Sequence, residues 1–203
     1  MRYPAFFDEV PRIALHDPLA EFLGALEGGF VEFSYLDAVR LAGHSCPTVA
    51  SAYGITRRAL AALYGDALPE RGALRVSFRE PIGEGVTGVI ANVVSMLTGA
   101  AHDGGFKGIA GRFFRRDLLA FGAEQPLALR FARIDTGASV DAEADIKRVP
   151  SDPRLPALLA RAAAGEAGAD ELRRFGELWQ DRVRRLLLEH GDDPAVFRIE
   201  SRA

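Results

Sequence analysis

Residues 43–65 read GHSCPTVASAYGITRRALAALYG and form the clearest helical segment in the N-terminal half of the chain. Apolar side chains recur at helical spacing over residues 49–64, which predicts an amphipathic helix. Pro47 suits the first helical position, because its missing N–H would have no partner there. Cys46 would then be the N-cap residue, with His44 two positions before it.

The segments around this helix predict an α+β protein. Apolar and polar residues alternate over 74–78 and 127–134, as in half-buried strands, and an apolar helical pattern covers 86–98. From Pro150 the composition shifts towards proline, alanine and arginine, and a long helical pattern follows. Helical and strand segments are grouped rather than strictly alternating, which is typical of α+β folds.

We expect two parts in the chain. Residues 1–150 would form the α+β domain, preceded by an N-terminal arm that packs on its surface. Residues 151–203 would form a C-terminal helical extension that packs on this domain or on a partner subunit. A short strand is expected at residues 196–199.

Composition argues against several functional classes. The net charge of −3 does not suggest a nucleic-acid-binding protein, and the one basic cluster, at residues 107–116, is interpreted as a solvated or interface-facing group. A single cysteine rules out an internal disulfide. No apolar run approaches the roughly 20 residues that a membrane span needs, and the first residues lack the layout of a secretion signal. We therefore expect a cytoplasmic protein with no nucleic-acid or membrane partner.

His44 and Cys46 form half of a predicted metal site. A thiolate and a neutral imidazole are preferred ligands of Zn²⁺ and also suit other late transition metals. The N-cap position favours a thiolate through the unpaired N–H groups of the first helical turn. Two alternatives remain: Cys46 packs as a small apolar residue beside a structural histidine, or it is the nucleophile of a thiol enzyme with His44 as its base.

The other half of the metal site would come from a second loop. His102 is the best candidate, because it lies in a glycine-rich loop that follows the helix at 86–98. Asp103 would be a ligand or would orient His102. His16 is a weaker candidate, since its position next to Asp17 is typical of a helix-cap neighbour. We expect the two loops to converge in the folded chain.

Two segments resemble the FmdE family, which is named after one of the subunits of formylmethanofuran dehydrogenase. Residues 37–47, DAVRLAGHSCP, and the helix after them resemble the Gly-His-x-Cys-Pro sequence that opens a long helix in the family. Residues 97–99, Leu-Thr-Gly, with Phe-Lys-Gly at 106–108, resemble a Thr-Gly-Cys turn and a loop containing Gly-Lys. The two segments and the helix between them cover the middle third to half of the chain.

The resemblance implies a mixed sheet backed by helices, a homodimer, and a metal ion bound between the two motifs with His44 and Cys46 as ligands. Ala100 stands where family members carry a cysteine, and we infer that His102 takes its place. The predicted function is a metal-binding protein of the FmdE-like family with one zinc-like ion per subunit, which acts on or senses a small ligand. The alternative is a non-catalytic accessory or structural module of a redox enzyme system.

Overall fold

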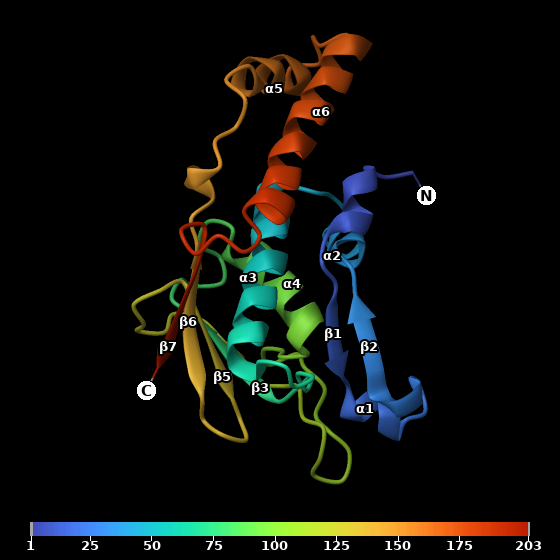
Figure 1. The fold of residues 1–203 in the computed structure, drawn as a ribbon, viewed down its shortest axis with the longest axis vertical. Helices are drawn as coiled ribbons and strands as arrows, with labels where there is room; N and C mark the ends of the chain where they lie inside the picture. The colour runs from blue at the N-terminus through green and yellow to red at the C-terminus, as the bar shows by residue number, and fades with distance from the viewer. Residues whose placement is uncertain (1, 203) are drawn as a thin grey trace.

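The computed structural model describes residues 2–202 and has the predicted α+β fold (Figure 1). Its main sheet has the strand order β4-β3-β5-β6-β7, in which β3 and β4 are parallel and the other neighbours are antiparallel. The strands of this mixed sheet are β3 (Leu74–Phe78), β4 (Leu119–Ala120), β5 (Leu129–Arg133), β6 (Ser139–Ala144) and β7 (Phe197–Arg202). A separate antiparallel pair is formed by β1 (Ile13–His16) and β2 (Phe30–Phe33).

Six α-helices accompany the two sheets within the described residues. They are α1 (Pro18–Phe22), α2 (Tyr35–Ala42), α3 (Pro47–Tyr64), α4 (Thr87–Thr98), α5 (Leu155–Ala163) and α6 (Ala169–Arg184). A π-helical turn, Arg185–Glu189, extends α6. No helix within residues 2–202 combines the length and the apolar character needed to cross a bilayer.

The core lies between the main sheet and the pair α3 and α4. In β3 the alternation predicted from sequence holds, because Leu74, Val76 and Phe78 are buried while Arg75 is exposed. Val76 and Phe78 belong to one apolar cluster with residues of α3 and α4, including Ile55. Leu74 belongs to a second cluster, which also contains residues of both helices. One face of the sheet is therefore covered by helices, as Figure 1 shows, and the opposite face carries polar side chains.

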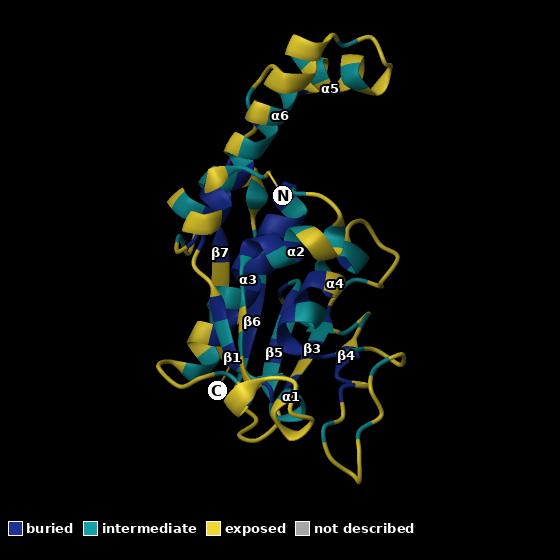
Figure 2. Ribbon diagram, turned by 90° about the vertical axis from the view of Figure 1, so that its right-hand side faces the viewer, coloured by how far each residue is buried: buried dark blue, intermediate teal, exposed yellow. Residues whose placement is uncertain are grey.

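The C-terminal segment divides between the body and a projection. Helix α5 and the first half of α6 extend away from the rest of the molecule and carry mostly exposed or half-buried residues (Figure 2). The end of α6 and the following turn rejoin the core, where Val183 and Leu186 are fully buried. Strand β7 then pairs along β6, which confirms the predicted strand near residues 196–199. Residues 151–202 thus supply an edge strand of the main sheet as well as helices.

Candidate functional site

Cys46 begins α3, as predicted. Gly43 ends α2 with a φ of 76°, a left-handed conformation that glycine adopts readily, and the chain turns there into α3. The Cys46 Sγ accepts a hydrogen bond from the Val49 N–H at 3.5 Å, and Pro47 occupies the first helical position. Only 9% of Cys46 is exposed. The thiol therefore has a fixed position at the helix start.

His44 lies in the same short loop and is exposed. Its Nδ1 is 2.9 Å from the carbonyl oxygen of Ala42. A carbonyl oxygen only accepts hydrogen bonds, so this contact requires the proton on Nδ1 and leaves the Nε2 lone pair free. Metal-binding histidines commonly hold the same arrangement, with the second ring nitrogen donating to a carbonyl or carboxylate.

Helix α6 fixes the loop between these two residues. Trp179 Nε1 and Gln180 Nε2 both donate to the Ser45 carbonyl oxygen, at 3.0 and 3.2 Å. The Ser45 hydroxyl donates to Gln180 Oε1 at 2.9 Å and also lies 2.9 Å from the Tyr35 hydroxyl. The helical spacing around Trp179 predicts a packing residue, either within this chain or against a second subunit. Its polar contact has no sequence signal, because nothing in the sequence pairs residues more than 130 positions apart.

His44 and Cys46 share a cavity of about 430 Å³. Its walls are mainly apolar and include Val86 and Val89 at the start of α4, together with Trp179. Arg182 also lines the cavity, with its guanidinium donating to the carbonyl oxygens of Val149 and Ile146 at 2.7 and 2.9 Å. Burial lowers the pKa of Arg182. The cavity therefore combines a thiol, an imidazole and an anchored cation in apolar surroundings.

His102 and Asp103 do not line this cavity. The loop that carries them is held along the edge of the main sheet, where Ala101 exchanges backbone hydrogen bonds with Arg115 and Leu118. His102 Nδ1 is 2.8 Å from Asp103 Oδ1, and this hydrogen bond lowers the pKa of the carboxyl. The His102 ring lies beside Phe121, with 5.5 Å between ring centroids. His102 is thus beside the edge strand β4, whereas the cavity is at the first turn of α4.

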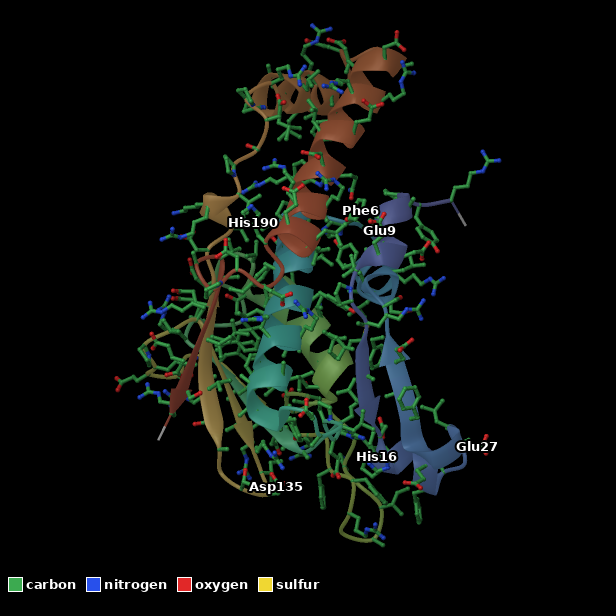
Figure 3. All side chains as sticks on the ribbon, viewed as in Figure 1. Phe6, Glu9, His16, Glu27, Asp135 and His190 are labelled. Atoms are coloured by element: carbon green, nitrogen blue, oxygen red, sulfur yellow. The ribbon has the colours of Figure 1, made fainter. Side chains whose placement is uncertain are left out.

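The remaining histidines also have other partners. His16 Nε2 is 2.8 Å from Glu21 Oε2, next to the start of α1, which is the cap-neighbour position expected from sequence. His190 Nδ1 is 3.0 Å from Asp193 Oδ2, after α6. Figure 3 shows these two histidines in separate parts of the molecule. Neither lines the cavity of Cys46.

One chain therefore offers an incomplete set of metal ligands. Within residues 2–202 no three histidine, cysteine, aspartate or glutamate side chains are grouped closely enough to hold an ion. Zinc takes four ligands in structural sites and three protein ligands in catalytic ones. The expected convergence of the two loops is not present within the chain, because hydrogen bonds hold the second loop along the sheet edge.

Comparisons with known proteins add no relative. No protein-family model matches the sequence, and no curated protein is similar enough to be counted as related. The resemblance to the FmdE family stays a prediction from the two motifs.

Proposed function

We propose that this protein is a metal-binding homodimer in which His44 and Cys46 of one copy bind a zinc-like ion together with His102 of the second copy. The observation that supports the proposal is the arrangement of His44 and Cys46. They line one cavity, and the Nδ1 contact of His44 leaves its Nε2 free to bind an ion. Both ligand types suit zinc and other late transition metals.

A second copy of the chain is needed in this proposal because the two motifs lie apart within one copy. The resemblance implies an ion between them, while in a single chain His44 and Cys46 lie before α3 and His102 lies in the loop between α4 and β4. The His102 side chain is 53% exposed and is accessible to another molecule. The projecting helices also carry large exposed apolar residues, Leu159 and Leu172, which would be covered in a dimer.

Three protein ligands leave one coordination position for a small molecule, which would make the protein a sensor or an enzyme acting on that ligand. The apolar walls of the cavity would then contact the ligand, and Arg182 would favour an anionic group on it. We assign the protein to the cytoplasm in this proposal, since a lone thiol stays reduced there.

Metal content tests the proposal. The native protein and the variants Cys46→Ser, His44→Ala and His102→Ala would be produced in zinc-supplemented medium and measured by mass spectrometry of the bound metal. We expect one ion per subunit in the native protein and loss of the ion in all three variants. His190→Ala is the matched control and should keep its ion. A metal-free native protein, or a His102→Ala variant that retains zinc, would overturn the proposal.

A further inference from the structure

A second cavity lies at the other end of α4, where Gly72 N–H donates to the Thr98 carbonyl oxygen. It has a volume of about 680 Å³ and is bordered by two segments, residues 70–75 before and within β3 and residues 112–118 before β4. Its lining contains five arginines against two acidic residues, Glu70 and Asp117. The arginines are Arg71, Arg75, Arg112, Arg115 and Arg116.

Arg115 is the buried member of this group. Only 7% of the residue is exposed, and its Nη2 donates to Asp17 Oδ1 at 2.7 Å. The Nη1 group is buried and has no hydrogen-bond partner within residues 2–202. A buried donor without a partner costs about 1–3 kcal/mol, and more when it is charged. Such groups are rare in native proteins, and each one calls for an explanation such as strain, an ordered water or a bound ion.

Two glycines make room for this guanidinium. A Cβ added at Gly72 or at Gly99 would overlap Arg115 Nη1. Both glycines also adopt positive φ angles, 89° and 73°. The two glycines therefore leave space for the Arg115 guanidinium, whose Nη1 group has no hydrogen-bond partner there.

The charges around Arg115 do not balance. Asp17 is buried and accepts hydrogen bonds from both Arg71 and Arg115, so one carboxylate faces two guanidinium groups. Arg75 and Arg112 form no ion pair with any carboxylate within residues 2–202. Burial lowers the pKa of Arg115, and a bound anion would offset this loss of hydration.

A second buried aspartate, Asp141, allows a comparison of how far the arginines paired with a buried carboxylate are exposed to water. Asp141 is fully buried and also pairs with two arginines, Arg130 and Arg202. Those two side chains are 31% and 43% exposed, so water solvates their excess charge. The side chain of Arg115 is 8% exposed and has no such solvation.

Apolar groups form the rest of the cavity. Phe114 and Ile134 line it and are 50% and 43% exposed. The guanidinium of Arg112 lies over the ring of Phe113, 4.5 Å from its centroid. A ligand that fills this space would need charged groups for the arginines and an apolar or ring portion for these side chains.

We propose that this cavity binds a small organic anion, whose phosphate or carboxylate groups contact the exposed Arg75 and Arg112 beside the buried charge of Arg115 and whose apolar portion packs on Phe114 and Ile134. Arginine recognises both anions through paired N–H donors. The site needs no second copy of the chain and no metal ion.

Isothermal titration of the native protein in a chloride-only buffer tests this proposal. Inorganic pyrophosphate and citrate distinguish phosphate from carboxylate recognition, and phenyl phosphate against inorganic phosphate tests the apolar wall. We expect saturable binding of at least one polyanion and tighter binding of phenyl phosphate than of phosphate. Arg75→Gln and Arg112→Gln should each weaken binding about tenfold, the loss of one charge-assisted hydrogen bond.

Both variants change exposed side chains, so they should fold like the native protein. Arg173→Gln, which alters an exposed arginine of α6, is the control and should bind as the native protein does. Absence of binding to all four probes would overturn the proposal. So would affinities unchanged in both cavity variants, or a double-stranded oligonucleotide that binds more tightly than any small anion.

Discussion

The two cavities lie at opposite ends of α4 and are built in different ways. The first borders Val86 and Val89 at the start of the helix, and its donors, His44 and Cys46, are two positions apart in sequence. The second lies near the end of the helix, where Gly99 contacts Arg115, and its charged groups come from distant segments. The helix has twelve residues, so the ends are about 18 Å apart.

The comparison shows that a site with a recognisable sequence motif can lack ligands in the folded chain, whereas charged groups from distant segments can form a cavity without such a motif. The His44–Cys46 pair is recognisable as a short motif but supplies only half of a metal site within one chain. The arginine cavity is visible in the sequence only as the basic cluster at residues 107–116, and the proposed anion site lies within one chain. It also stabilises the fold through Asp17, which the first cavity does not do. Substitutions at the two ends should therefore have very different effects on stability.

The largest effect is expected for Asp17→Ala. This change leaves Arg71 and Arg115 without their shared carboxylate and removes the acceptor of two N–H groups at the start of α1. Breaking a buried ion pair on one side costs about 3–5 kcal/mol. Urea denaturation should show this loss, whereas Asp170→Ala, at an exposed ion pair of α6, should leave the midpoint nearly unchanged. Equal stability of the two variants would contradict the account.

The next largest effect is expected for Gly72→Ala. The new methyl group would overlap Arg115 Nη1, in a backbone conformation with φ of 89° that alanine adopts poorly. We expect a loss of about 2 kcal/mol in the free energy of unfolding, from backbone strain and displacement of the guanidinium. Gly137→Ala has a similar φ of 76° but open space around it, so it should lose only about 1 kcal/mol. A reversed order would show that Arg115 is not confined.

The pH dependence of stability should also depend on Asp17. Burial raises the pKa of this carboxyl, but hydrogen bonds from Arg71 and the Ala20 N–H and the charge of Arg115 outweigh burial, so the pKa lies below its usual value. Its stabilising contribution is therefore complete above the unfolded pKa of about 4 and is lost as the pH falls through the folded value.

Acid titration of the free energy of unfolding measures this effect. Asp17→Asn should lose stability less steeply than the native protein below about pH 4, since it lacks the carboxyl that takes up a proton on unfolding. Asp170→Asn should follow the native curve. Parallel curves for native protein and Asp17→Asn would contradict the role assigned to this carboxylate.

The smallest effect is expected at the other end of α4. Metal-free Cys46→Ser keeps an acceptor for the Val49 N–H and should change the free energy of unfolding by less than about 1 kcal/mol. Thermal unfolding of the metal-free proteins provides the measurement. If Cys46→Ser lowered the free energy of unfolding as much as Asp17→Ala does, Cys46 would be a structural residue and not a metal ligand.

Local features of the fold were predictable because they depend on neighbours in sequence. Pro47 and Cys46 indicated the start of α3, and the alternation around Val76 indicated the buried face of β3. The helical pattern over residues 86–98 corresponds to α4, Thr87–Thr98. Each of these predictions rests on backbone geometry or on the period of one element.

The long-range features were not predictable in the same way. The basic cluster around Arg115 looks solvated in the sequence, because its contacts with Asp17 and Gly72 join segments far apart in the chain. The contact of Trp179 with Ser45 has the same cause. The path of the loop carrying His102 depends on its pairing with the sheet edge, which no local pattern revealed.

The most direct test of the proposed metal site uses a mixed dimer of Cys46→Ser and His102→Ala chains, isolated with two different affinity tags. If ligands from two copies build each site, one of the two sites in this mixed dimer keeps His44, Cys46 and His102 intact. We predict one zinc ion per mixed dimer and none in either variant alone. A mixed dimer without zinc would contradict the account, as would the absence of a dimer.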